Sequence, residues 1–471
     1  MLTFSNRNKA TLVFIFFLII FSILQYRVPE IIGFDGWLHI KMADLIRHEG
    51  FINPAPYSTI LVDTYADNQL GFRILLIPFT FLGLIHGAKI ASILFASAAF
   101  TIFYWYLRKN NSINYPFFWT AAYAFASYDL LYRFLEPRAM PLAILSLVLT
   151  LFFIEKRMYK SIFILSLLFG WLYYGFVFQL FIISVFLAID YLKKRKLDIN
   201  LILYPIAGIA LSIVINPYFP ASISHLYTQL FQVNLVSNLY NAEWKSWGIL
   251  DFIKFNWIYM LLYLTSVGAI IRNQKFDKKQ LGLFIISTIF LVAMLKTRRM
   301  HEYFAPFSVL FAAFCLGNKE NNSHARYISV AALVLISLFS LVSLNEYIHN
   351  NHFLPWYKEG ADFLRTLPEG SKVFINAYTY TYFFFYNPSL EYTHGIDLTY
   401  SYLKDPQKFE RYISVLQGKD PGINIVKDYD ANYAVIGKIR QDINLFDYMI
   451  NYQDDFELIY EDKNLGILRV K

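Results

Sequence analysis

Long apolar segments alternate with short polar breaks along the first 344 residues of this chain. Two of the clearest are TLVFIFFLIIFSIL (11–24) and YISVAALVLISLFSLV (327–342). A helix needs about 20 mainly apolar residues to cross a bilayer. The pattern predicts eleven membrane-spanning helices, at 11–26, 87–107, 113–132, 137–154, 161–172, 176–192, 199–216, 250–271, 281–295, 303–316 and 327–344.

Basic residues gather in alternate breaks, at Arg108–Lys109, Lys156–Arg157–Lys160, Lys193–Lys196, Arg272–Lys279 and Lys319–Arg326. Because Lys and Arg concentrate in cytoplasmic loops, these breaks and the amino terminus are expected to be cytoplasmic. Arg7 and Lys9 precede the first segment and no small-residue cleavage site follows it, which predicts a retained helix rather than a signal peptide. The assignment requires GFRILLIPFTFLGLI (71–85) to be a re-entrant or interfacial helix.

This topology places four polar stretches on the outer face: the first loop (27–70), RFLEPR (133–138), the loop 216–247 and KTRRMHEY (296–303). The last stretch is basic on the side that should be poor in positive charge. Cations beside a membrane often mark an anion site, and arginine matches phosphate oxygens with two parallel donors. Arg298, Arg299 and His301 are therefore predicted to bind a lipid phosphate or pyrophosphate. The alternative is that one arginine only extends to the headgroups.

After residue 345 the pattern becomes that of a water-soluble α/β domain. WYKEGADFLRTLPEG (356–370) predicts an amphipathic helix, and SKVFINA (371–377) and ANYAVIG (431–437) predict strands. FELIYEDKNLGILRVK (456–471) predicts a hairpin. The expected organisation is a transmembrane domain over 1–344 and a soluble extracytoplasmic α/β domain over 345–471.

Composition supports a multi-pass membrane protein. Hydrophobic residues make up 57% of the 471 residues and charged residues only 16%, against about a quarter in soluble domains. The net charge of +8 resides mostly in the polar breaks, so it indicates topology rather than a nucleic-acid partner. Cys315 is the one cysteine, which excludes an intrachain disulfide and a cysteine metal site.

The stretch FDGWLHIKMADLI (34–46) places Asp35 and His39 four residues apart where the chain should leave the membrane. An apolar first helix followed by this Asp-x-x-x-His opening resembles the GT-C glycosyltransferases. The resemblance is to the oligosaccharyltransferase catalytic subunit and its smaller bacterial relatives. It extends to LLIPFT (75–80), PRAMPL (137–142), NPYFP (216–220), AEW (242–244) and RRMHEYFAPF (298–307).

The resemblance implies a polytopic α-helical enzyme with a GT-C-like fold in a prokaryotic plasma membrane. It would move a sugar or glycan from a polyprenyl-phosphate or pyrophosphate carrier to an unidentified glycan, lipid or protein acceptor. Asp35 would be the first-loop catalytic acid, acting as a base directly or through a divalent cation, Mg or Mn. Without the resemblance, Asp35 is an ordinary helix cap.

Further site residues follow from the same comparison. His39 faces the same way as Asp35 and could bind metal, contact phosphate, orient Asp35 or have no role. Asp35, Asp67, Glu136 and Glu243 could form an oxygen-ligand metal site. For the phosphate, Arg73 and Arg138 are second choices after Arg298 and Arg299. Alternatively, Glu136 forms an ion pair with Arg133 or Arg138, and Glu243 is a solvated loop residue.

The chain departs from the family in two places. In YADNQLGFR (65–73), Asn68 and Gln69 replace the histidines of relatives, which weakens the predicted metal site. In the tail, FINAYTYTYFFFY (374–386) contains no acid where oligosaccharyltransferases carry Trp-Trp-Asp-Tyr-Gly, so asparagine glycosylation is not expected. These aromatic residues are expected to pack internally rather than to stack on a sugar.

Two other classes remain open. A transporter or flippase of lipid-linked glycans would place charges inside helices and show related halves, and no convincing repeat is present. A non-catalytic envelope-polymer assembly protein on a degenerate GT-C fold would explain the missing acids and histidines. Acids in the loops favour an inverting glycosyltransferase.

Overall fold

The computed structural model describes residues 6–51, 66–67, 69–110, 112–232, 241–273, 276–317, 323–351, 354–416, 423–438, 442–452 and 454–471. Parts of the two predicted outer loops, 52–65, 68 and 233–240, lie outside these ranges. Contacts divide the chain into two units, which are described separately. Unit 1 comprises Met1–Ile32, Asn68–Phe219 and Asn241–Asn350, and unit 2 comprises Gly33–Asp67, Pro220–Tyr240 and Asn351–Lys471.

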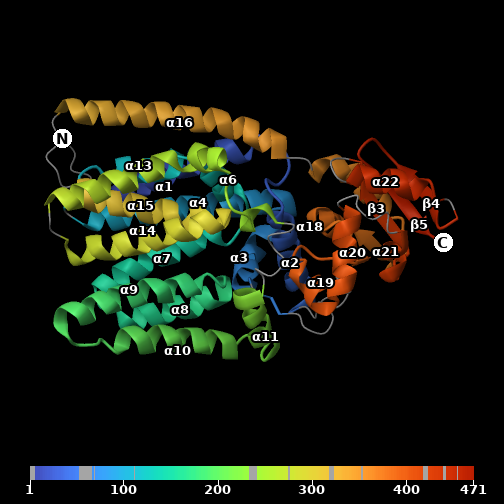
Figure 1. The fold of residues 1–471 in the computed structure, drawn as a ribbon, viewed down its shortest axis with the longest axis horizontal. Coiled ribbons are helices and arrows are strands. Elements are labelled where there is room, and N and C mark those ends of the chain that lie inside the picture. The colour runs from blue at the N-terminus through green and yellow to red at the C-terminus, as the bar shows by residue number, and fades with distance from the viewer. Residues whose placement is uncertain are drawn as a thin grey trace. The chain divides into compact units, whose positions relative to one another are not determined.

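Unit 1 is a bundle of helices (Figure 1). Its elements are α1 (Asn6–Gln25), α3 (Leu70–Thr80), α4 (Leu84–Lys109), α5 (Pro116–Phe125), α6 (Tyr128–Leu135), α7 (Met140–Glu155), α8 (Tyr159–Leu172), α9 (Phe176–Lys194), α10 (Asn200–Val214), η3 (Ala242–Trp244), α13 (Ile249–Asn273), α14 (Lys278–Lys296), η4 (Arg298–Met300), α15 (His301–Leu316) and α16 (Ser323–Asn351). Helix is present at all eleven predicted positions. The prediction of one continuous helix over 113–132 is wrong, because α5 ends at Phe125 and the Ser127 hydroxyl caps α6 by accepting from the Leu130 amide.

Among the described residues, six helices are long and apolar enough to cross a membrane: α1, α4, α9, α13, α14 and α16. The pair α6–α7, bent by 105°, gives a seventh if it is one span. The helices at the other predicted positions are shorter, so the count of eleven crossings stays a prediction. α3 has 11 residues and is about 16 Å long, well short of a bilayer core of about 30 Å.

Ion pairs join the turns that were predicted to be cytoplasmic. Asp190 is 2.7 Å from both Arg157 and Lys278, and Lys279 is 2.9 Å from Glu155. These contacts connect the α7–α8, α9–α10 and α13–α14 turns. The turns between the alternate helices meet in a separate cluster, described below, as expected of helices that alternate in direction.

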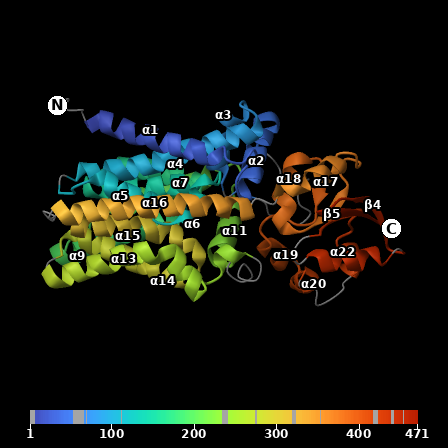
Figure 2. The same ribbon diagram turned by 90° about the horizontal axis from the view of Figure 1, so that it is seen from above.

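The amino-terminal helix packs along α4, as Figure 2 shows. Phe17 and Phe21 stack on Phe100 with ring centroids 4.8 and 5.7 Å apart. At the carboxyl end of α1, the fully buried Lys89 donates from Nζ to the carbonyl oxygens of Gln25, at 3.1 Å, and Val28. The last carbonyls of a helix have no partner within the helix, so this ammonium satisfies groups that burial would otherwise leave unpaired.

Replacing Lys89 by Met is expected to lower the free energy of unfolding by about 1–3 kcal/mol, because buried carbonyls then lose their donor. Thermal unfolding of the purified protein in detergent measures the change. Lys109→Met, at the exposed end of the same helix, is the matched control and should change little. Equal stability of the two variants would contradict the capping role.

Unit 2 is an α/β unit around one five-stranded sheet. Its elements are α2 (Asp35–Glu49), α11 (Ala221–Tyr227), η1 (Thr228–Gln232), η5 (Leu354–Tyr357), α17 (Lys358–Leu364), β1 (Lys372–Ile375), α18 (Ala377–Tyr386), β2 (Glu391–Tyr392), α19 (Thr399–Lys404), α20 (Pro406–Leu416), α21 (Ile423–Asp428), β3 (Tyr433–Gly437), α22 (Asp442–Ile450), β4 (Phe456–Glu461) and β5 (Leu465–Val470). The strand order is β2-β1-β3-β5-β4. β1 pairs in parallel with β2 and β3, whereas β5 is antiparallel to β3 and β4. The predicted helix, two strands and hairpin are confirmed, and β2 was not predicted.

The sheet is covered on both faces. Phe374, Ala434 and Leu468 are partners across β1, β3 and β5, and they join a core formed with α20 and α22. Leu465 on β5 packs against Gly360 of α17, where an added Cβ would lie 2.6 Å from the leucine side chain. In Figure 2, α17 and α18 lie on one side of the sheet and α20 and α22 on the other. The unit therefore has its own core, as an independent domain requires.

A buried histidine gives unit 2 a pH dependence. The His394 ring lies 4.1 Å from that of Tyr412, and its Nδ1 is 3.2 Å from the Ser401 hydroxyl. Burial, with a contribution from Lys408, lowers the pKa of His394 from 6.5 to about 3. Between these values the unfolded chain binds a proton that the folded chain does not, so stability is complete above pH 6.5 and declines as the pH falls.

The contribution of His394 to the change of the free energy of unfolding with pH is at most about 1.4 kcal/mol per pH unit. We expect the thermal unfolding temperature to fall between pH 7.5 and 4.5, and His394→Gln to remove part of that fall. Melting curves of the two proteins over this range make the comparison. Parallel pH profiles for wild type and variant would count against a neutral buried imidazole.

Candidate functional site

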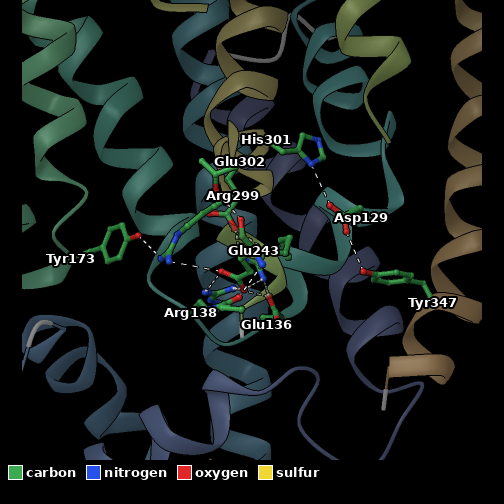
Figure 3. A network of polar contacts seen from close by, with 12 residues as sticks. Asp129, Glu136, Arg138, Tyr173, Glu243, Arg299, His301, Glu302 and Tyr347 are labelled. Carbon is green, nitrogen blue, oxygen red and sulfur yellow. Dashed lines mark hydrogen bonds and ion pairs between the residues drawn. The ribbon is translucent and has the colours of Figure 1, made fainter. Parts of the chain in front are cut away.

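Three arginines and three glutamates of unit 1 form one cluster, called here the arginine–glutamate cluster (Figure 3). Its members are Arg133, Glu136, Arg138, Glu243, Arg299 and Glu302. They come from the end of α6, the α6–α7 turn, η3, η4 and the start of α15. Three of the four polar stretches predicted to share a face therefore meet through their side chains.

Arg133 is the centre of the cluster. Its Nε and Nη2 lie 2.7 and 2.6 Å from Glu302, and its Nη1 donates to Glu136 at 2.9 Å and to Glu243 at 2.7 Å. Only 13% of the Arg133 side chain is exposed, and Glu136 and Glu302 are buried. Charges at this depth must be paired, and one guanidinium pairs with all three acids.

Arg138 holds two of the same acids from the other side of the turn. It donates to Glu136 at 3.2 Å and to Glu243 at 3.0 Å. Burial alone would raise the pKa of Glu243, but Arg133, Arg138 and Arg299 together lower it well below its usual value. Glu243 is therefore a stable anion that neutralises guanidinium charge, rather than a group that exchanges protons near neutral pH.

Arg299 is the least committed of the three guanidiniums to a carboxylate. It donates to the Tyr173 hydroxyl at 2.6 Å and lies 3.9 Å from Glu243, at the limit of an ion pair. Its guanidinium also lies over the rings of Trp244, at 5.4 Å, and Tyr173, at 5.8 Å. Neutral groups thus fix its position, and among the described residues its ion pair with Glu243 is a long one.

Arg298 makes different contacts from its neighbour. Its guanidinium is 3.5 Å from Asp251 and lies 5.0 Å from the Trp247 ring. Its amide donates to the Lys245 carbonyl at 3.0 Å, and Thr297 donates to the Glu243 carbonyl at 2.9 Å. The predicted pair of phosphate-binding arginines therefore faces two sets of partners.

His301 is held by Asp129 rather than by the arginine–glutamate cluster. Its Nδ1 lies 3.3 Å from the Asp129 carboxylate, which accepts a second bond from the Tyr347 hydroxyl at 3.3 Å. Asp129 and Arg133 are one turn apart on α6, and they contact the consecutive residues His301 and Glu302. These two contacts fix the start of α15 on α6.

The other predicted site residues are distributed over both units. Asp35 is the half-buried first residue of α2, and the N-cap is Phe34, so the alternative of an Asp35 cap is wrong. A carboxylate in the first turn still complements the helix dipole. His39 and Asp67 are buried in unit 2, and Arg73 is buried on α3 in unit 1.

Of the predicted metal ligands, Glu136 and Glu243 belong to unit 1 and Asp35 and Asp67 to unit 2. In the part of the chain that the structure describes, no group of three or more His, Cys, Asp or Glu side chains could hold an ion. Glu136 and Glu243 instead accept hydrogen bonds from guanidiniums, as the alternative for Glu136 predicted. A divalent cation at Glu136 and Glu243 would have to displace these arginines, so these two residues do not fit the expected Mg or Mn.

Sequence reasoning missed Glu302 and Tyr173 as members of the site. Glu302 is in the first turn of an apolar helix, next to a basic stretch that can supply a cation. Tyr173 stands in the break between two apolar segments on the predicted outer side. These positions can be recognised in the sequence, but the sequence does not show that Glu302 pairs with Arg133 or that Tyr173 accepts from Arg299.

No family model matches the chain, and no curated protein matches it. Several solved structures do match it. The archaeal oligosaccharyltransferase AglB from Archaeoglobus fulgidus, in complex with an inhibitory peptide and a dolichol-phosphate, aligns with a TM-score of 0.60 at 12% identity over 92% of this chain and 70% of AglB. ArnT from Cupriavidus metallidurans, bound to undecaprenyl phosphate, aligns with a TM-score of 0.56 at 10% identity over 97% of each chain.

This chain has a GT-C-like fold. The alignments include both the membrane helices and the carboxyl-terminal sheet, so the predicted fold class is confirmed. A further A. fulgidus oligosaccharyltransferase structure, in complex with Zn and sulfate, aligns with a TM-score of 0.57 at 14% identity, covering 90% of this chain and 67% of that one. The apolar helices and the GT-C-like fold identify an integral membrane protein.

Proposed function

We propose that the protein is an inverting glycosyltransferase of the membrane that takes a sugar or glycan from a polyprenyl-phosphate or pyrophosphate carrier. The observation that carries the proposal is Arg299, a fixed guanidinium that lies 3.9 Å from the nearest carboxylate among the described residues, that of Glu243. The GT-C-like fold supports the general kind of reaction, since its solved examples include complexes with dolichol-phosphate and undecaprenyl phosphate.

Arg299 is assigned to the phosphate of the carrier. Arg133 and Arg138 each lie within 3.0 Å of Glu243, so an anion would have to displace a carboxylate to reach them. Arg299 can turn its free donors to a phosphate while Tyr173 and Trp244 keep the guanidinium in place. A cation held in advance at the position where charge develops stabilises the transition state.

Asp35 is assigned as the base. In the proposed step, an oxygen or nitrogen of the acceptor attacks the anomeric carbon from the side opposite the carrier phosphate. The bond between the anomeric carbon and the phosphate oxygen breaks, and its electron pair leaves with the phosphate, whose charge Arg299 stabilises. The acceptor proton passes to the Asp35 carboxylate, and a single displacement inverts the anomeric centre.

Arg299→Met is expected to weaken binding of undecaprenyl phosphate by about 10- to 100-fold, because a charge-assisted hydrogen bond contributes about 1.5–3 kcal/mol. Binding to the purified protein in nanodiscs can be measured by titration of the radiolabelled lipid. Arg298→Met is the matched control, since Arg298 faces Asp251, and it should change the affinity less than twofold.

Sugar transfer itself is tested with a radiolabelled polyprenyl-phosphate sugar and an envelope extract as the source of acceptors. Label should leave the carrier only when intact wild-type protein is present. Lipid binding that is equal in Arg299→Met and wild type would refute the phosphate assignment. Tight carrier binding without any transfer would favour the assembly-protein alternative.

A further inference from the structure

The helix that carries Asp35 is part of the tail unit. α2 belongs to unit 2, and it packs against α18, which follows the first strand of the sheet. The candidate base therefore sits on an element that the α/β unit positions. The contact between α2 and α18 decides how that helix is oriented.

Trp37 makes this contact. Its side chain is fully buried, and its ring lies edge-on to Tyr382, with centroids 4.8 Å apart, and to Phe385, at 4.9 Å. Tyr386 closes the group at 6.2 Å. These three rings of α18 are called the aromatic cup. Perpendicular ring pairs at these distances are favourable beyond the area they bury, and they allow few alternative poses.

The aromatic cup is itself held from behind. The Lys358 ammonium lies 4.7 Å from the Tyr386 ring and the Arg365 guanidinium lies 5.5 Å from it. Tyr382 also packs edge-on against Tyr386, at 5.0 Å. The aromatic cup that holds Trp37 is therefore supported by residues of α17 and its carboxyl end as well as by α18.

Helix geometry links Trp37 to the candidate base. Successive residues of an α-helix are about 100° apart, so Trp37 lies about 200° from Asp35 around α2, on the opposite side. Asp35 and His39 are separated by only about 40° and share a face. With Trp37 in the cup, the Asp35–His39 face is directed away from α18.

We propose that Trp37 is a positioning residue: seated in the aromatic cup of α18, it sets the rotation of α2 and hence the direction of the Asp35 carboxylate. This inference rests on the proposed function for the role of Asp35. The inference also gives a role to the aromatic tail segment 374–386, because three of its rings pack against the helix that carries the candidate base. Thr379, Tyr380 and Phe383–Phe385 are buried there, as the packing interpretation predicted.

The rotation of α2 can be measured without any substrate. In full-length protein carrying Cys315→Ala, spin labels are attached through Glu49→Cys at the end of α2 and Glu410→Cys on α20, both exposed and both in unit 2. Wild type should give one narrow distance distribution by pulsed electron resonance. Trp37→Ala and Phe385→Leu should shift or broaden the distance distribution, whereas Trp37→Phe should leave it like that of wild type.

Leu45→Ala is the matched control, because it removes a buried side chain from the same helix at comparable cost to stability. It should lower the melting temperature and leave the distance distribution narrow. A Trp37→Ala distribution identical to that of Leu45→Ala would overturn the inference. The milder Trp37→Phe and Phe385→Leu variants keep the test decisive if Trp37→Ala does not fold.

Turnover separates this inference from the proposed function. With the radiolabelled polyprenyl-phosphate sugar, Trp37→Ala should lower kcat by about 10- to 100-fold, with KM for the donor within twofold, because only the base is displaced. A shifted α2 with unchanged kcat would also overturn the inference. If wild type transfers no sugar, the proposed function fails, while the label distances still decide whether Trp37 positions α2.

Discussion

Asp35→Asn is expected to lower the rate of sugar transfer by about two to four orders of magnitude at saturating donor. A positioned general base contributes about 10²- to 10⁴-fold, and an amide cannot accept the acceptor's proton. The substitution keeps the shape of the side chain. Loss of a first-turn charge from α2 removes only about 0.3–1 kcal/mol of helix stabilisation.

The measurement is initial-rate transfer from the radiolabelled polyprenyl-phosphate sugar by purified wild-type and variant protein. Asp44→Asn, on the same helix, is the control: Asp44 forms ion pairs with Arg47 at 2.9 Å and Lys41 at 3.5 Å. It should keep full activity. An Asp35→Asn enzyme as fast as Asp44→Asn would remove Asp35 from the mechanism.

Arg133→Met is expected to lower the free energy of unfolding by about 3–5 kcal/mol, the usual effect of removing one partner from a buried ion pair. Glu302, buried at the start of α15, would lose the guanidinium that contacts it through both Nε and Nη2. Glu243 and Glu136 would keep Arg138. Most of the lost free energy of unfolding should therefore come from the unpaired carboxylate of Glu302.

Thermal unfolding in detergent measures the loss, and Arg298→Met serves as the matched control. Arg298 and Asp251 are 34% and 48% exposed, and exposed pairs contribute at most about 1 kcal/mol. Adding Glu302→Gln to Arg133→Met should recover part of the stability, because the uncompensated charge is then absent. A double variant less stable than Arg133→Met would argue against this account.

The helices of unit 1 were predictable because apolar runs of bilayer length have few alternatives in a chain this hydrophobic. The strands of the tail were predictable from short apolar runs bounded by turn residues, such as YAVIG, which is buried at all five positions. β2, with two residues, has no period to detect. The break at Ser127 falls inside an apolar stretch, and only the capping serine marks it.

The arginine–glutamate cluster was only partly predictable. Topology placed its loops on one face and singled out Arg299, whereas Glu136 and Glu243 were named from the family resemblance. The pair Arg133–Glu302 joins residues 169 positions apart, and periodicity carries no information on contacts of that range. The assignment of α2 to the tail unit was missed for the same reason, because its partner α18 lies far along the chain.

The packing of Trp37 against α18 has a consequence for the protein during its synthesis on the ribosome. The ribosome adds about 5–20 residues per second, so the cup appears roughly 20 to 70 seconds after the tryptophan that fills it. Until then the Trp37 side of α2 lacks its partner helix. A chain that terminates between α2 and α18 would leave this apolar side without the aromatic cup.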